Sequence, residues 1–164
     1  MLEKFESILV KFDPVFKWMS TIILGGMTIL IFIQVVFRYV FTNPLAWSEE
    51  IAKYLFIWMT FIGGYVGARQ NKHIGVEALQ KALPGVLGKG VKSLAYLITA
   101  AFFIIVLYNT CAYWPRLAMQ TSPALEIPIT FVYLSMIIGS LFMALWYILL
   151  ALKVFQKKKE EVKA

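Results

Sequence analysis

Residues 18–37 read WMSTIILGGMTILIFIQVVF, a run of twenty residues that carries no charge and lies between Lys17 and Arg38. An α-helix rises about 1.5 Å per residue, so roughly 20 residues cross a hydrocarbon core about 30 Å thick. The run therefore predicts a membrane-spanning helix. It is longer than the apolar part of a signal peptide and follows a mixed-charge segment, so we interpret it as a permanent span.

Three further apolar runs follow along the chain. The run at 54–68 is short for a span, and it reaches full length when it is extended back to Trp47. Glu49, Glu50 and Lys53 then lie in the first two helical turns, where carboxylates suit a helix N-terminus and Lys can snorkel. The sequence predicts an all-α integral membrane protein, with residues 1–164 forming a single four-helix membrane domain. Its spans cover about 18–37, 47–68, 93–115 and 127–152.

The segment before the first span has its own periodicity. Its apolar residues recur at steps of three and four, which predicts an amphipathic helix lying in the membrane interface. Pro14 predicts a break or bend before the first span. The apolar positions are Leu2, Phe5, Leu9, Phe12 and Phe16.

The composition excludes several classes of protein. Hydrophobic residues make up 60% of the 164 residues and charged residues 15%. In a soluble domain, about half of the residues are apolar and about a quarter are charged. The same apolar excess excludes a disordered chain. The net charge is +7, but the basic residues flank the apolar runs instead of forming one stripe, so no nucleic acid is expected as a partner. Membrane lipids are expected partners, with residues 157–159 near anionic headgroups.

The distribution of Lys and Arg predicts the topology. The segments 1–17, 69–92 and 153–164 hold 3, 5 and 5 of these residues, and 38–53 and 116–126 hold 2 and 1. The first three segments thus hold 13 Lys and Arg residues in total, and the two segments that alternate with them hold 3. Because positively charged flanks stay in the cytoplasm, both termini are expected inside and the two sparsely charged loops outside.

The chain lacks the pairs of Cys or His residues that disulfide, thiolate-metal and haem chemistry need. A lone Cys111 and a lone His73 exclude an internal disulfide, a multi-thiolate metal site and paired haem ligands. Glu49 and Glu50 point about 100° apart on a helix and would not converge on one bond. We therefore expect no enzyme activity, no catalytic residue, no metal and no cofactor.

The interiors of the spans also lack ionisable residues, which argues against a transport pathway through this chain alone. Gln34 is interpreted as a hydrogen-bonding residue between helices. Small residues predict close helix contacts, either within the chain, with a partner, or both. The small residues that predict these contacts are the glycines Gly25, Gly26, Gly63, Gly67 and Gly139.

Several spaced motifs resemble the small membrane subunit, or Q subunit, of the tripartite ATP-independent periplasmic (TRAP) transporters of the dicarboxylate and sialic acid systems. The first stretch contains FRYVF at 37–41, WSEEIAKYLFIW at 47–58, FIGG at 61–64, AR at 68–69 and KHIGV at 72–76. The second is QTSPALEIP at 120–128. Lys53 departs from the Arg that similar chains often carry, which keeps the charge but loses bidentate pairing.

The resemblance implies a bacterial inner-membrane protein with two partners. One is a large membrane subunit (M type) that carries substrate and sodium, and the other is a periplasmic substrate-binding protein (P type) that delivers an organic acid. It also implies that the small subunit acts as a scaffold. The chain ends soon after its fourth span, so the unfused form with a separate large subunit is expected. The substrate stays open between sialic acid, C4-dicarboxylates and other carboxylates.

Few charges face the periplasm in this topology, and they are candidates for docking the binding protein because complementary charges orient protein association. Alternatively, Arg38 could anchor the first span at the headgroups, and Glu49 and Glu50 could cap the second span or pair with Lys53. The candidates are Arg38, Glu49, Glu50, Arg116 and Glu126. The competing function is an autonomous four-helix exporter of cationic drugs, which would need a membrane-embedded acid.

Overall fold

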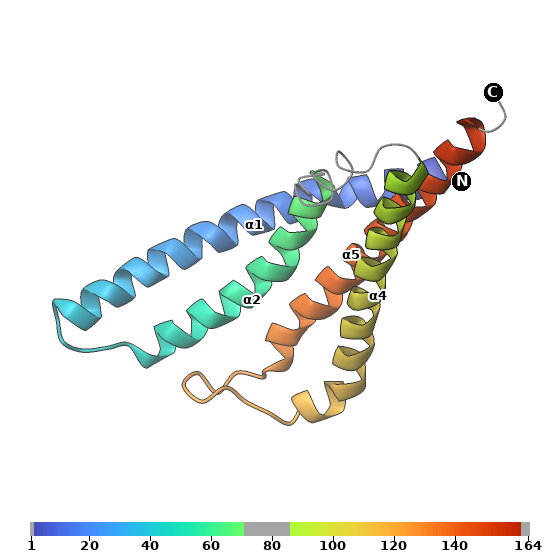
Figure 1. Cartoon of the computed structure of the whole chain (residues 1–164). Helices are drawn as coiled ribbons and strands as arrows, with labels where there is room; N and C mark the ends of the chain where they lie inside the picture. Colours follow the sequence, from blue (N-terminus) through green and yellow to red (C-terminus); the bar gives the residue numbers. More distant parts are fainter. Residues whose placement is uncertain (1, 71–85, 162–164) are drawn as a thin grey trace.

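The computed structural model describes residues 2–70 and 86–161, which form four long helices (Figure 1). Each is long and apolar enough to cross a membrane. The prediction of an all-α protein with four membrane spans is therefore confirmed. The KHIGV motif and His73 lie outside the described residues. The helices are α1 (Leu2–Tyr39), α2 (Ala46–Arg69), α4 (Val86–Leu117) and α5 (Thr130–Glu161).

The first helix is not broken at Pro14, where the sequence predicts a break or a bend. Residues 2–17 are helical as expected, but Pro14 lies inside α1, which continues without interruption to Tyr39. A proline removes one backbone hydrogen bond from the helix, and Leu9 and Phe16 are buried on either side of it, so tertiary packing holds both halves in place. At 38 residues, α1 is about 57 Å long, enough to cross the hydrocarbon core and continue past it.

The four helices form two adjacent hairpins, α1 with α2 and α4 with α5 (Figure 1). The helix α5 packs against each of the other three, whereas α4 contacts α5 alone among the described helices. Both chain termini lie at one end, here called the terminus end. The opposite end, here called the loop end, contains the connections 40–45 and 118–129.

The buried core lies toward the terminus end. The rings of Phe16, Tyr65 and Phe142 meet edge to face, with centroids 4.8–5.5 Å apart, a favourable geometry for aromatic pairs. The apolar side of the N-terminal segment thus packs on α2 and α5. The buried cluster comprises Leu9, Phe16, Ile62, Tyr65, Ala68, Tyr96, Ala100, Met143, Trp146, Tyr147, Leu149 and Ala151.

An ion pair joins three helices beside this core. Arg69 of α2 donates from Nε to both carboxylate oxygens of Asp13 at 3.0 Å and from Nη2 to Oδ2 at 2.7 Å. The guanidinium also lies 3.9 Å from the ring centroid of Trp146 on α5. The indole N–H of Trp146 in turn donates to the carbonyl of Ala68 at 3.1 Å. These contacts attach the N-terminal segment to the helices that it crosses.

The glycines differ in what surrounds them. A Cβ at Gly139 of α5 would lie 2.6 Å from Cβ of Phe61 and 3.0 Å from its backbone, so α2 and α5 touch closely there. A Cβ at Gly64, which the sequence did not single out, would lie 2.5 Å from Met143. Gly63 faces Met59 of its own helix. A Cβ at Gly25, Gly26 or Gly67 would meet no atom within 4 Å, so these three line open surface in this chain.

Candidate docking surface

The charged residues selected from the sequence all lie at the loop end of the helices. Arg38 is in the last turn of α1, and Arg116 is in the last turn of α4. Glu49 and Glu50 begin α2, and Glu126 lies in the connection that precedes α5. The fold therefore brings five residues from across the sequence to one end of the molecule.

The two arginines are exposed and lie near tyrosine rings of their own helices. The Cζ atom of Arg38 lies 6.0 Å from the ring centroid of Tyr39, and that of Arg116 lies 5.6 Å from that of Tyr113. Within residues 2–70 and 86–161, neither guanidinium forms a salt bridge. Both positive charges are accordingly free to meet a partner from outside the chain.

Glu49 is also at the surface. Its Oε1 lies 2.9 Å from Nζ of Lys53, one turn further along α2, and the two side chains are 56% and 68% exposed. Water and salt weaken an ion pair this exposed, and either group can exchange it for another partner. Glu49 therefore stays accessible to a binding partner.

Glu50, its neighbour in sequence, has different surroundings. The residue is only 8% exposed, and its carboxylate accepts three hydrogen bonds. The Tyr54 hydroxyl donates to Oε1 at 2.5 Å, and the backbone N–H groups of Ala124 and Leu125 donate to Oε2 at 2.9 and 3.0 Å. Glu50 thus bonds inside the chain, and we leave it out of the docking surface proposed below.

The connection that Glu50 holds folds back on itself over residues 120–129, here called the 120–129 loop. The N–H of Ser122 donates to the carbonyl of Ile127 at 2.9 Å, and the N–H of Ile129 donates to that of Gln120 at 3.1 Å. The buried Ser122 hydroxyl accepts from the N–H of Ile127 at 3.3 Å. Glu126 has a φ of 56°, a left-handed conformation that few non-glycine residues adopt. The loop therefore has a defined shape and presents Glu126 at its surface.

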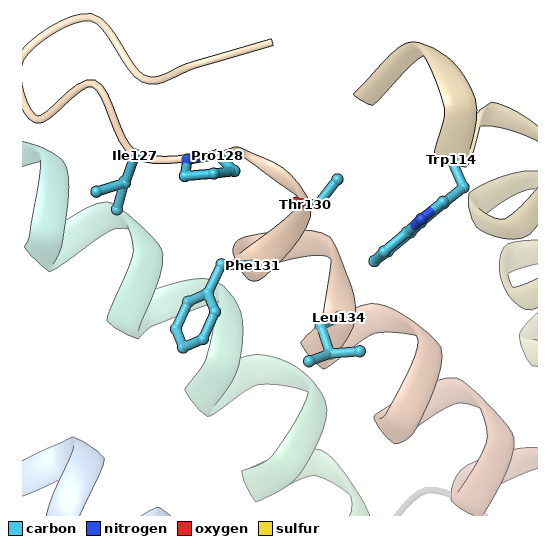
Figure 2. Close-up of a pocket in the computed structure, with 6 residues that line it drawn as sticks. All are labelled: Trp114, Ile127, Pro128, Thr130, Phe131 and Leu134. Carbon is cyan, nitrogen blue, oxygen red and sulfur yellow. The ribbon is translucent and has the colours of Figure 1, made fainter. Parts of the chain in front are cut away.

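Two apolar grooves lie beside this loop. Figure 2 shows the larger groove, which has a volume of about 510 Å³. The ring of Trp114 on α4 points toward the start of α5, whereas the ring of Phe131 points away from Trp114 and toward α2. Phe131 also lines a second groove of about 360 Å³ between α1, α2 and α5. Neither lining offers a charged group, so these grooves suit hydrocarbon better than a carboxylate. The larger is lined by Trp114, Ile127, Pro128, Thr130, Phe131 and Leu134.

Sequence reasoning missed the two networks that organise the ends. Asp13 and Arg69 are 56 positions apart, and no local pattern links them. The bond between Glu50 and Tyr54 follows the i, i+4 spacing of a helix, so that spacing could have indicated it. Among the described residues, no group of His, Cys, Asp and Glu is placed to hold a metal ion.

Comparison with known families adds an independent finding. Residues 27–157 match the model of the family described as "Tripartite ATP-independent periplasmic transporters, DctQ component". This match includes the second, third and fourth spans, the C-terminal part of the first and the 120–129 loop.

Several curated relatives carry TRAP transporter names. The C4-dicarboxylate TRAP transporter small permease protein DctQ of Vibrio cholerae is 31% identical over 102 residues, which cover 62% of this chain and 44% of that protein. A putative TRAP transporter small permease protein of Haemophilus influenzae is 28% identical over 83% of this chain and 82% of its own length. The sialic acid TRAP transporter permease protein SiaT of the same species is 28% identical over 50% of this chain and 13% of its own length.

The share of each relative that the match covers therefore ranges widely, and the match to the Vibrio protein spans less than half of it. A family model that matches most of the chain and four helices able to span a membrane lead to the same conclusion. The chain belongs to the DctQ-component family of the tripartite ATP-independent periplasmic transporters, and it is a multi-pass bacterial inner-membrane permease subunit and not an enzyme.

Proposed function

We propose that this chain is the small membrane subunit that holds a large transport subunit in place during sodium-coupled uptake of an organic acid. The family match over residues 27–157 carries this proposal. The positions of the charges support a scaffolding role. In the described part of the four helices, the apolar stretches 18–37, 54–68, 93–115 and 130–152 hold no charged residue. Substrate and coupling ions are then handled by the partner.

The lengths of the relatives support a large membrane partner. The match to SiaT covers only 13% of that permease, so most of that permease lies beyond the matched region. The open glycines Gly25, Gly26 and Gly67 are surfaces where another helix could approach closely. We infer that this chain has the role that the matched region of SiaT has within that permease.

The names of the relatives support the substrate class. One relative is named for C4-dicarboxylates and another for sialic acid. Both compounds carry a carboxylate, so we propose an organic acid as the substrate of the complex. This acid is delivered by a soluble periplasmic binding protein.

We further propose that the loop end faces the periplasm and receives this binding protein. The division of Lys and Arg, 13 against 3, supports this orientation. The docking surface consists of exposed charges of both signs at that end, which would steer and orient the soluble partner. Its residues are Arg38, Glu49, Arg116 and Glu126.

The test is reconstitution. This chain, the large membrane subunit and the binding protein are combined in proteoliposomes, and uptake of a labelled organic acid is measured with an inward sodium gradient. We expect uptake only when all three proteins are present, and co-purification of the two membrane subunits in detergent. Sodium-driven uptake by this chain alone would show that it carries its own transport site and would refute the proposal.

A further inference from the structure

The carboxylate of Glu50 is used entirely within the chain, although it lies at an end of the molecule where water is near. Three donors converge on it, and two of them are consecutive backbone N–H groups of the 120–129 loop. Consecutive N–H groups that point at one oxygen form a small anion-binding nest. One side chain of α2 thus connects to a loop 74 and 75 positions further along the sequence.

This connection fixes a loop whose outer side is accessible. Ser122 is 2% exposed and bonds inward, whereas the neighbouring Thr121, Pro123 and Glu126 are exposed. Surface loops are usually the most mobile parts of a protein. In the 120–129 loop, backbone N–H groups donate to Glu50 and to the Ser122 hydroxyl on the buried side of the loop. The exposed groups on its outer side therefore keep one arrangement.

A loop held in one shape has a consequence for binding. A partner that recognises a mobile loop must order it, and the conformational entropy lost in doing so weakens the complex. A loop already held in its bound shape avoids this loss. We propose that Glu50 is a positioning residue that keeps the 120–129 loop in the conformation recognised by the periplasmic binding protein, an inference that rests on the function proposed above.

The test compares E50Q with wild type in the complete three-protein system. Glutamine has the same shape, and its carbonyl oxygen can accept from the two loop N–H groups while its NH₂ donates to the Tyr54 hydroxyl. It carries no negative charge, however, and hydrogen bonds to a charged acceptor are roughly twice as strong as neutral ones, so the bonds that hold the loop become weaker. We expect faster backbone hydrogen exchange across residues 120–129. We also expect the binding-protein concentration that gives half-maximal uptake to rise on the order of three- to tenfold. Uptake at saturating binding protein and assembly of the two membrane subunits should be unchanged.

Two variants serve as controls. E3Q removes the same charge from an exposed site at the terminus end and should change neither readout. E49Q removes the neighbouring charge without touching the loop bonds, so it should leave exchange in the loop at the wild-type rate, whatever its effect on docking. These variants separate a loss of charge from a loss of loop position.

A second variant covers the case in which E50Q fails to assemble. S122A removes a buried hydroxyl that accepts from Ile127, so it loosens the loop and alters no exposed atom. We expect the same pair of changes as for E50Q. Faster exchange with an unchanged half-maximal concentration would overturn the inference, and so would unchanged exchange in both variants. If wild-type uptake does not depend on the binding protein at all, the proposed function fails first, and the two failures are thereby distinguished.

Discussion

At the scale of single residues, Arg69 of α2 contacts side chains on two other helices. It pairs with Asp13 and stacks on Trp146, and the Arg69 and Asp13 side chains are only 12% and 16% exposed. The planar guanidinium suits both contacts, because it bonds a carboxylate through two nitrogens and lies flat on an aromatic ring. A lysine could make neither contact in the same way.

Replacing Arg69 by Met should destabilise the chain. The Asp13 carboxylate would be left mostly buried with only the Tyr65 hydroxyl donating to it, at 3.3 Å, at a cost of about 1–3 kcal/mol. The D13L/R69M double variant should recover most of this loss, because no buried charge is left without a partner. Thermal unfolding of the purified chain in detergent measures both effects.

The exposed pair Glu49–Lys53 provides the control for this experiment. The E49Q/K53Q double variant should unfold close to the wild-type midpoint, since both side chains are more than half exposed. If D13L/R69M were as unstable as R69M, burial of a lone carboxylate would not be the cause of the loss.

Arg38 tests the docking surface at the same scale. R38E should lower uptake at limiting binding protein and weaken its dependence on ionic strength, because an exposed charge acts mainly on the association rate. R38K keeps the charge and should behave like wild type. The readout is uptake against salt concentration, with co-purification of the membrane subunits as the check on assembly.

Either of two results would count against a docking role for Arg38. Unchanged uptake and salt dependence in R38E would show that the residue does not meet the partner. Loss of membrane assembly would show that Arg38 acts within the membrane complex.

At the scale of helices, α5 is the central element because it contacts α1, α2 and α4. Its contact with α2 is close because Gly139 has no side chain to separate the two backbones. On the facing helix, Gly64 makes room for the side chain of Met143. Both glycines lie in the interface between α2 and α5, but Gly139 faces the rigid backbone of Phe61 and Gly64 faces the flexible end of Met143.

This difference predicts a graded response to alanine. G139A should be the most harmful, because its Cβ meets the backbone of Phe61 and α2 must move, at a cost of about 1–3 kcal/mol. G64A should cost less, because the flexible end of Met143 can turn away. G26A should not destabilise the isolated chain, since its Cβ meets no atom within 4 Å. Thermal unfolding of this chain alone ranks the three variants, and equal losses would contradict the α2–α5 contact.

At the scale of the whole molecule, the two termini share one end, and the short connections share the other (Figure 1). The ion pairs of Arg69 with Asp13 and of Lys153 with Glu6 both lie at the terminus end. The Glu50 network lies at the loop end. Each end is therefore held by polar contacts of its own, while the stretches of helix between them carry no charge.

The orientation of the molecule in the membrane can be tested with reporter fusions. Fusions at Ala164 and near Lys81 should report the cytoplasm, and a fusion near Asn43 should report the periplasm, because Lys and Arg divide 13 to 3 between the two sides. Paired alkaline phosphatase and fluorescent protein fusions measure this directly. A periplasmic C-terminus would invert the topology and move the docking surface to the wrong side of the membrane.

The amino-acid sequence by itself determined the number of spans and their approximate positions. A hydrocarbon core accepts only long apolar helices, so twenty uncharged residues such as 18–37 have one stable solution. Local periodicity likewise indicated the helical N-terminal segment. The motifs at 37–76 and 120–128 indicated the family that the later comparison showed.

Only the tertiary structure decided which side chains are available to a partner. Glu49 and Glu50 are chemically identical neighbours, and burial of one depends on a loop more than 70 positions away. Pro14 lies inside a continuous helix because contacts on both sides hold the chain there. Each outcome depends on contacts between residues far apart in sequence, and such contacts leave no local pattern because the fold, and not the helical repeat, brings the two residues together.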